Sequence, residues 1–336
     1  MLKNVFNQDK RVELSEQEYR EKEMPTLIGT LGFNWNFNLS AYSDSTVIKT
    51  PETWFRGLYN SKSRLVSEDY LLNFRTGASN LSMSMGVSLF NNNPYIAATL
   101  ANREAQDDPN DLIELPKPSN LKTSLSATIK ARRSKRSYSG QRMSLKELAT
   151  LLHHAQGITG EQDVAHFDAT VTLGKKNTVQ TRAAPSGGGL YPIDLYFLAM
   201  NVADLTPGVY RYSPYYHAVA LVKNLEAEIN NDETKAKLIE QLGHFEGWQV
   251  NKCNLFFMYV YRLLVNSRKY ADSGLAFGLI EVGCTSQNVH LASTAMLLAS
   301  CDAGSYSKSG IEKLIGIDGL TEHLVHFTII GKENIE

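Results

Sequence analysis

Residues 132–136 concentrate positive charge in a short segment. They read Arg132, Arg133, Ser134, Lys135 and Arg136, so that four cations and one hydroxyl occupy five positions. Guanidinium groups offer planar pairs of N–H donors that match phosphate oxygens, and a serine hydroxyl adds a further donor. The segment therefore favours phosphate binding. A solvated basic turn is the alternative interpretation, whereas a nucleic-acid site is disfavoured because no interleaved aromatic residues accompany the cluster.

A run of three glycines precedes one of the predicted strands. The segment contains Pro185, Ser186, Gly187, Gly188 and Gly189. Consecutive glycines lose much conformational entropy on folding, but they let backbone N–H and C=O groups approach a flat ligand or an anion closely. The segment matches neither a Walker A loop nor a Gly-x-Gly-x-x-Gly turn that opens a helix. We expect a loop that contacts a ligand, with a plain loop as the alternative.

Two pairs of adjacent polar residues are candidates for chemistry or ligand contact. Lys269 and Tyr270 can both transfer protons if burial or a nearby cation lowers their pKa values. As a dipeptide alone, the pair is typical of an exposed loop. Gln287 and Asn288 lie in a long apolar segment that predicts a helix, where a buried amide requires hydrogen-bond partners. Contact with a ligand edge and hydrogen bonding between helices are both compatible with this pair.

Histidines and cysteines do not form a metal-binding pattern. Cys253, Cys284 and Cys301 lie far apart without a CxxC pair, which also argues against a disulfide framework. The His-Glu-x-x-His motif is absent, and His290 and His326 have no carboxylate at a metal-ligand spacing. A serine hydrolase is disfavoured because the sequence lacks the Gly-x-Ser-x-Gly turn. We expect no bound metal.

Composition is that of an ordinary soluble globular protein. Of the 336 residues, 43% are hydrophobic and 21% are charged, and the formal net charge is −1. Such a small net charge provides no overall field that would attract nucleic acid or an anionic membrane. The longest apolar run, Leu255–Tyr261, is too short to span a bilayer, and the first residues lack the apolar core of a signal peptide. We therefore expect a cytoplasmic protein.

The pattern divides the chain into two regions. Residues 1–110 are polar and irregular with scattered aromatic residues, and spaced prolines and acidic residues over 107–118 disfavour a helix at their end. We treat 1–110 as an N-terminal region that is a candidate for binding a partner or a peptide. Residues 111–336 are patterned more sharply, and we assign one α+β domain to them.

Several elements of the second region are expected to position the candidate residues. Ser144-Leu-Lys-Glu147 spells a capping box that opens a helix, and Gly157 is expected to end it. The other predictions are buried strands over 194–200 and 255–262, a hairpin over 208–222, a long helix over 276–300 and a short strand over 326–330.

Five segments, taken in order, resemble the SagB/McbC-type dehydrogenases of the nitroreductase-like superfamily. The five segments are residues 132–140, 144–152, 157–160, 185–192 and 281–288. The resemblance covers residues 112–332, and the order of the motifs is more specific than any one of them. The chain departs from the family's pattern at Cys284, where the family usually has histidine, and over 271–277.

The resemblance implies a nitroreductase-like α+β fold, in which a central, mainly antiparallel sheet is flanked by helices, with an N-terminal extension. It also implies a homodimer that holds FMN at the subunit interface. The cofactor contacts that it implies are, for the phosphate, Arg132, Arg133, Ser134 and Arg136; for the flavin ring, Pro185, Ser186, Gly187, Gly188 and Gly189; and at single positions Asn288, Gly304 and Lys332.

The family oxidises thiazoline or oxazoline rings, within ribosomally made peptides, to thiazole or oxazole. Its Lys-Tyr pair corresponds to Lys269 and Tyr270, which the resemblance makes the catalytic residues for proton abstraction. We therefore expect an FMN-dependent azoline dehydrogenase that acts on a peptide beside a cyclodehydratase, with the reduced flavin reoxidised by oxygen. Two alternatives stay open: an NAD(P)H-dependent nitro or quinone reductase, and a flavin-binding scaffold subunit of a peptide-modifying complex.

Overall fold

The computed structural model describes residues 67, 70, 71, 74, 80–92, 107–163 and 178–334. The chain divides into two compact units, Met1–Arg75 and Thr76–Glu336. In the first unit, the ring centroids of Tyr70 and Phe74 lie 5.7 Å apart. Every helix and strand given below belongs to the second unit. Most of the predicted N-terminal region, 1–110, lies outside the described residues.

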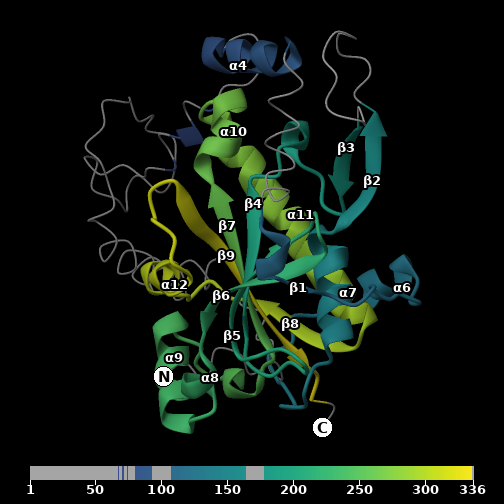
Figure 1. Cartoon of the computed structure of the whole chain (residues 1–336), viewed down its shortest axis with the longest axis vertical. Coiled ribbons are helices and arrows are strands. Elements are labelled where there is room, and N and C mark those ends of the chain that lie inside the picture. The colour runs from purple at the N-terminus through teal and green to yellow at the C-terminus, as the bar shows by residue number, and fades with distance from the viewer. Residues whose placement is uncertain are drawn as a thin grey trace, which may run out of the picture. The chain divides into compact units, whose positions relative to one another are not determined.

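Seven strands of the second unit form one antiparallel sheet (Figure 1). The described strands are β1 (Leu112–Glu114), β2 (Ile158–Asp163), β3 (Thr178–Arg182), β4 (Ile193–Ala199), β5 (Gly208–Ser213), β6 (Ala218–Asn224), β7 (Leu255–Arg262), β8 (Leu298–Asp302) and β9 (Glu322–Lys332). The order in the sheet is β1-β6-β5-β4-β7-β9-β8, and all neighbouring pairs are antiparallel. A separate hairpin pairs β2 with β3. The predicted strands near 194–200 and 255–262 and the predicted hairpin are confirmed.

Helices cover both faces of this sheet. The described α-helices are α4 (Leu81–Asn92), α6 (Leu125–Ala131), α7 (Leu145–Gln156), α8 (Glu226–Ile229), α9 (Asp232–Leu242), α10 (Leu263–Tyr270), α11 (Ser273–Ala295) and α12 (Lys308–Ile315), with short 3-10 turns η7 (Pro109–Asp111), η8 (Gly187–Gly189) and η9 (Val250–Lys252). One face packs on α7 and α11, and the other on α8, α9 and α12 (Figure 1). The expected α+β architecture, an antiparallel sheet flanked by helices, is confirmed.

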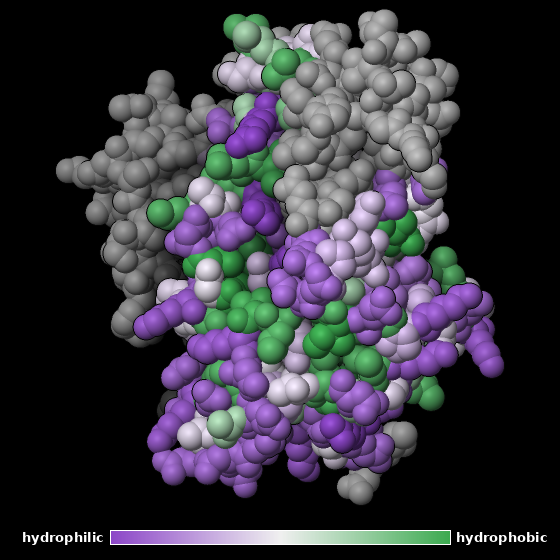
Figure 2. All heavy atoms as spheres, viewed as in Figure 1, coloured by the Kyte–Doolittle hydropathy of each residue, from purple (hydrophilic) through white to green (hydrophobic). Residues whose placement is uncertain are grey.

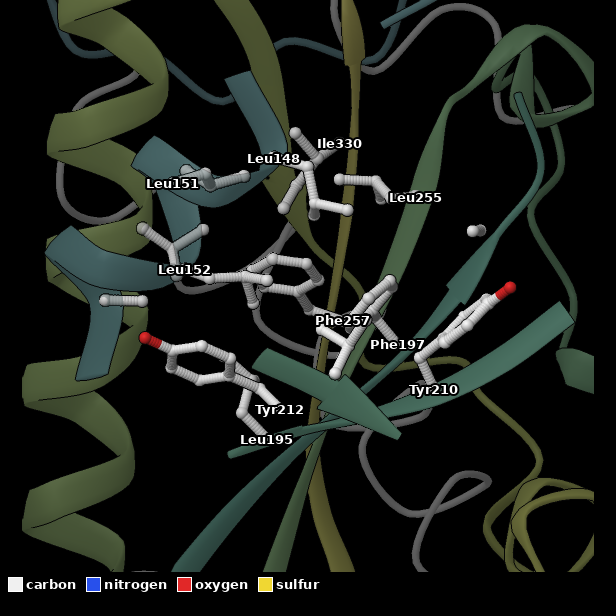
Figure 3. Close-up of a cluster of buried hydrophobic side chains, with 14 of the residues drawn as sticks. Leu148, Leu151, Leu152, Leu195, Phe197, Tyr210, Tyr212, Leu255, Phe257 and Ile330 are labelled. Atoms are coloured by element: carbon white, nitrogen blue, oxygen red, sulfur yellow. The ribbon is translucent and has the colours of Figure 1, made fainter. Parts of the chain in front are cut away.

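Strand β4 explains why the central strands are almost continuously apolar. Successive side chains of a strand point to opposite faces of its sheet. Leu195 and Phe197 therefore join the core beneath α7 and α11, while Tyr196 and Leu198 join the core on the other face. All residues of β4 are buried because both faces are covered. Figure 3 shows the first of these cores, with Phe197 among side chains from α7 and the neighbouring strands.

The capping box at the start of α7 is confirmed, and it involves one of the predicted cofactor residues. The Ser144 hydroxyl accepts a hydrogen bond from the Glu147 N–H at 3.2 Å, and the Glu147 carboxylate accepts one from the Ser144 N–H at 2.9 Å. Lys332, at the end of β9, forms an ion pair with the same carboxylate. Burial would raise the pKa of Glu147, but these hydrogen bonds outweigh it and lower the pKa. Lys332 thus ties the last strand to α7.

Two of the predicted boundaries are wrong. The long helix, α11, ends at Ala295 instead of Ser300, and the apolar residues that follow form β8. The apolar pattern continues through both elements, so periodicity alone cannot separate them. The chain changes direction at Leu297, whose φ is +56°, and β8 then pairs with β9. Strand β9 is also longer than the predicted 326–330, because it pairs with both β7 and β8.

The hydropathy of the surface differs between helices of the second unit. Figure 2 shows hydrophilic side chains over α8 and α9 and apolar side chains over α4. Among the described residues, no helix combines the length and the apolar character that a membrane crossing requires. The same residues contain no group of three or more His, Cys, Asp or Glu side chains arranged to hold a metal ion.

Candidate functional site

The glycine-rich turn meets the Lys-Tyr pair, although some eighty positions of sequence separate them. A Cβ atom placed on Gly188 would lie 2.5 Å from Lys269 Nζ and 2.5 Å from the Tyr270 hydroxyl oxygen. A Cβ atom on Gly187 would lie 3.6 Å from the Tyr270 ring. Real Cβ atoms do not approach other atoms as closely as 2.5 Å, so a side chain at position 188 would displace the Lys269 amine and the Tyr270 hydroxyl. The structure therefore joins two segments that were predicted separately.

Lys269 and Tyr270 occupy the last turn of α10, which follows β7 directly. Lys269 is 8% exposed and Tyr270 9% exposed, so the alternative of an exposed loop pair is wrong. Neither side chain makes a hydrogen bond or an ion pair with another described residue. Burial lowers the pKa of Lys269 from its ordinary value of 10.5 and raises the pKa of Tyr270. Burial therefore favours a neutral amine beside a neutral phenol.

A buried hydrogen-bond network fixes the connection between α10 and α11. Tyr261, the penultimate residue of β7, donates its hydroxyl proton to Asn266 Oδ1 at 2.7 Å. The Asn266 amide donates to the Gly274 carbonyl oxygen at 2.8 Å. A Cβ atom on Gly278 of α11 would lie 2.5 Å from the Tyr261 ring, so only glycine permits this close packing. The network orients the end of α10 that carries the Lys-Tyr pair.

Four residues with positive φ lie where the two segments meet, and two of them are not glycine. Gly188 and Gly189 have φ values of +65° and +67°. Tyr191 and Ala271 have φ values of +50° and +49°, a region that residues with a Cβ rarely adopt. Each such residue costs on the order of 1–3 kcal/mol and persists only where the surroundings impose it. Strain of this kind clusters at active sites and ligand clamps.

Side chains around the turn hold its shape. The Ser186 hydroxyl accepts a hydrogen bond from the Tyr191 N–H at 2.8 Å, which closes the turn. The Tyr191 hydroxyl accepts one from the Arg182 N–H at 3.0 Å, and the Arg182 guanidinium lies 4.5 Å from the Tyr191 ring centroid. Pro185 is exposed, as are Gly187 and Gly188. Pro185 and the glycine backbone are thus exposed to solvent, while the Ser186 oxygen is used in a hydrogen bond within the turn.

The basic segment 132–136 begins at the C-terminal end of α6. Arg132 is partly buried, and its guanidinium has no hydrogen bond or ion pair with any other described residue. Arg133 instead donates to the carbonyl oxygens of Lys130 at 3.1 Å and of Arg132 at 2.7 Å. Ser134 is exposed. Arg132 therefore keeps donors for an anion, whereas the guanidinium of Arg133 is bound to its own backbone and the Ser134 hydroxyl lies within hydrogen-bond reach of the Cys301 thiol.

The same segment runs beside strand β8. The Lys135 N–H donates to the Ser300 carbonyl oxygen at 3.1 Å. The Arg136 guanidinium lies 4.8 Å from the Trp248 ring centroid. Gly304 follows β8 and is exposed, and a Cβ atom placed on it would meet no atom within 4 Å. The structure thus brings the basic segment and the Gly304 loop to the same edge of the sheet.

Asp302, the last residue of β8, is a polar centre that the sequence analysis missed. Its carboxylate accepts hydrogen bonds from the hydroxyls of Thr328 at 2.6 Å and Ser286 at 3.1 Å. The Nε2 atoms of His290 and His326 lie 3.0 and 3.1 Å from its Oδ1. Burial would raise the pKa of this carboxyl, but the hydrogen bonds from the imidazoles and from Thr328 outweigh it and hold the pKa well below its ordinary value. Asp302 anchors the start of the Gly304 loop.

The amide pair of α11 separates into one exposed and one partly buried residue. Gln287 is exposed. The Asn288 amide donates to the Ala155 carbonyl oxygen, at the end of α7, over a long 3.4 Å. Hydrogen bonding between helices therefore accounts for this contact of Asn288. One of its N–H donors and its carbonyl oxygen make no hydrogen bond to another described residue.

Most of the predicted cofactor residues fall into two groups that approach α11 at different points. The first group is the glycine-rich turn with Lys269 and Tyr270, which directly precede α11. The second group is the basic segment with the Gly304 loop, which lies beside β8. That loop begins at Asp302, whose carboxylate accepts a hydrogen bond from Ser286, and Ser286 lies about 20 Å along α11 from its first residue.

Apolar side chains are exposed on the helices that link these groups. On α11, Leu279 and Ile280 are 47% and 63% exposed. On α6, which packs against α11, Leu125 and Ile129 are 66% and 55% exposed. A Cβ atom on Gly283 of α11 would meet no atom within 4 Å, so this face of the helix is open. Exposed apolar residues on helices are typical of surfaces that bind another protein chain.

Comparison with known proteins relates the second unit to one family. The profile of the nitroreductase family matches residues 129–332. A curated protein, putative nitroreductase MJ1384 of Methanocaldococcus jannaschii, is 25% identical over 207 residues, which are 62% of this chain and 91% of that protein. The matched region contains both groups of predicted cofactor residues, while α4 lies outside it.

Two solved structures are similar in fold. A putative nitroreductase from Anabaena variabilis ATCC 29413 superposes with a TM-score of 0.50 and 19% identity, covering 66% of this chain and 42% of that one. A chain of the E. coli microcin synthetase McbBCD complex, with truncated pro-MccB17 bound, superposes with a TM-score of 0.47 and 17% identity, covering 97% and 100%.

Proposed function

Because the chain belongs to the nitroreductase family of flavoprotein oxidoreductases, we propose that it is an FMN-dependent dehydrogenase of the SagB/McbC type. It oxidises thiazoline or oxazoline rings of a ribosomally made peptide to thiazole or oxazole. One observation carries this proposal: the buried Lys269 amine and the Tyr270 hydroxyl both point at the strained glycine-rich turn. A reductase that receives hydride from a nicotinamide needs no base at this position.

The residues of both groups fit FMN. A phosphate requires donors that are still available, and Arg132 offers them at the edge of the sheet, while Ser134 would exchange its contact with the Cys301 thiol for the phosphate. A flat ring requires backbone that is not covered by side chains, and a Cβ atom on Gly189 or Gly304 would meet nothing within 4 Å. Lys332 is paired with Glu147 and Arg133 with carbonyl oxygens, so we leave these two out of the phosphate-binding set.

The cofactor site is completed by a second copy of the chain. Within one chain the two groups approach α11 at points about 20 Å apart, and each flavin would take the basic segment of one subunit and the glycine-rich turn of the other. A twofold axis makes two such sites. The exposed apolar residues of α6 and α11 supply a surface for that contact.

The chemistry follows from the protonation states that burial favours. Lys269, with its lowered pKa, is the base that takes the acidic α-proton of the azoline ring. Tyr270, with its raised pKa, stays a phenol and donates a hydrogen bond to the substrate. FMN held by these residues would supply the two-electron oxidation of the ring, with oxygen as the final acceptor, which would leave as hydrogen peroxide. The ring loses two hydrogens and becomes aromatic.

The setting of this reaction is part of the proposal. Azoline rings are made from Cys, Ser or Thr side chains, so a cyclodehydratase has to act on the peptide first. We propose that the N-terminal region, 1–110, binds the peptide or that partner enzyme. We place the whole reaction in the cytoplasm.

An azoline-containing peptide tests the proposal. Purified protein should carry FMN and remove two hydrogens from each ring, which mass spectrometry detects. Lys269→Ala should keep FMN and lose about 100-fold or more of this activity, as expected when a general base is removed. If Lys269→Ala keeps both FMN and full activity, the catalytic assignment fails and the scaffold alternative gains. Rapid oxidation of NADPH without any effect on the peptide would instead favour the reductase alternative.

A further inference from the structure

Helix α4 packs directly on the helix that carries the Lys-Tyr pair, although it lies outside the matched residues 129–332. A Cβ atom placed on Gly86 would lie 2.5 Å from the Lys269 carbonyl oxygen and 2.8 Å from that of Arg268. Only a glycine at this position lets the backbones of α4 and α10 approach so closely. The position of α4 is thus specified by contact with Lys269 itself.

One turn further along α4, Phe90 covers the Lys269 side chain. Phe90 is 4% exposed, and the Lys269 Nζ atom lies 5.5 Å from its ring centroid. Phe90 belongs to a small apolar cluster with Tyr270, Val265 of α10 and Leu190 of the glycine-rich turn. The Lys269 amine thus lies beside two aromatic rings of this cluster, those of Phe90 and Tyr270.

Charge on α4 cannot account for the state of the amine. The helix contains no acidic or basic residue, and the titratable neighbours of Lys269 on its own element are Tyr270 and the exposed Arg268. Attraction between an ammonium and the Phe90 ring would favour the charged amine. Burial acts in the opposite direction and lowers the pKa of Lys269 by desolvation.

We propose that α4 is part of the catalytic site, and that Phe90 is a positioning residue which shields the Lys269 amine from water and holds it towards Gly188. This inference rests on the proposed function for its catalytic meaning. The shielding and orientation of the Lys269 amine by α4 do not depend on which substrate is bound. A segment that precedes the matched region therefore tunes the base of the active site.

Site-resolved acetylation of the full-length protein tests this directly. Acetic anhydride reacts with neutral amines only, so the pH at which Lys269 is half-maximally labelled, read by peptide mass spectrometry, reports its protonation. In the wild-type protein this midpoint should lie below 10.5. Phe90→Ala should raise the midpoint by about one pH unit, a tenfold loss of neutral amine at fixed pH. Phe90→Leu should restore most of the wild-type value because it returns apolar volume.

A second variant and a control separate this effect from loss of folding. Gly86→Ala displaces α4 without removing Phe90, so it should raise the midpoint in the same direction. Leu89→Ala, on the exposed face of α4, should leave it unchanged because Leu89 is 55% exposed. An unchanged Lys269 midpoint in both Phe90→Ala and Gly86→Ala would overturn the inference, whatever the azoline activity. If the midpoints shift but no variant or wild-type protein oxidises azolines, the inference holds and the proposed function fails.

Discussion

Lys269 and Gly188 are in such close contact that no side chain larger than hydrogen fits between them. The amine nitrogen would lie 2.5 Å from a Cβ atom on Gly188. The contact joins the end of α10 to the turn before β4, and it leaves the amine facing a surface made of backbone.

Gly188→Ala should abolish azoline oxidation while the protein stays folded. The new methyl group would displace both the amine and the Tyr270 hydroxyl, and a misplacement of about 1 Å can cost about 100-fold in rate. Gly316→Ala, at the end of α12, is the matched control, because its φ of +76° imposes a similar backbone cost but its Cβ would meet nothing within 4 Å. Steady-state kinetics with circular dichroism would check this. Equal losses in the two variants would mean that backbone strain, and not the clash, is responsible.

The pH dependence of kcat/KM should show a base with a lowered pKa. Lys269 accepts a proton only when it is neutral, so the rate should rise with pH and level off above the Lys269 pKa, below 10.5. Lys269→Arg should be inactive at every pH, because a guanidinium stays protonated. In Tyr270→Phe, kcat/KM should still rise with pH, but it should be lower than in the wild-type protein at every pH. A wild-type profile that is flat from pH 6 to pH 10 would remove Lys269 from this role.

Arg132→Ala should weaken FMN binding about tenfold to about 100-fold, since hydrogen bonds to a charged group contribute about 1.5–3 kcal/mol. Arg133→Ala offers a neighbouring control of the same charge, because its guanidinium donates to backbone carbonyl oxygens. Fluorescence titration of the apoprotein with FMN measures both. If the two variants lose affinity equally, overall positive charge binds the phosphate and the specific assignment of Arg132 is wrong.

Mixing two inactive variants tests whether the site is shared between subunits. A dimer of Arg132→Ala with Lys269→Ala chains has one site with both defects and one site with none. Unfolding and refolding the two together should therefore restore about a quarter of the wild-type activity per site, since half of the dimers are mixed. Each variant refolded alone should stay inactive when the FMN concentration is high enough to fill wild-type sites but too low to fill those of Arg132→Ala. Complete lack of recovery would place both groups of residues of one site in a single chain.

The parts of the fold that depend on local sequence could be predicted. The Ser144–Glu147 capping box and the β5–β6 hairpin use residues that lie within a few positions of one another. The end of α11 could not be predicted, because the apolar residues up to Ser300 fit a buried strand as well as a helix. Their pairing with β9 decides between the two.

The candidate site was only partly predictable, for the same physical reason. Glycine-rich and basic segments can be recognised from residue type, but burial of Lys269 depends on Phe90, which is far away in the sequence. Asp302 gives no local signal either, because its donors come from α11 and β9. The sequence showed no carboxylate partner for His290, whereas in the folded chain His290 contacts Asp302.

Anaerobic reduction of the bound flavin tests the central claim most directly. The absorbance of the oxidised flavin should be bleached by a peptide that contains azoline rings, with loss of two hydrogens per ring, and should return when oxygen is admitted. NADPH alone should bleach it slowly or not at all. Rapid bleaching by NADPH together with an inert azoline peptide would contradict the account, as would a purified protein that is colourless and does not bind added FMN.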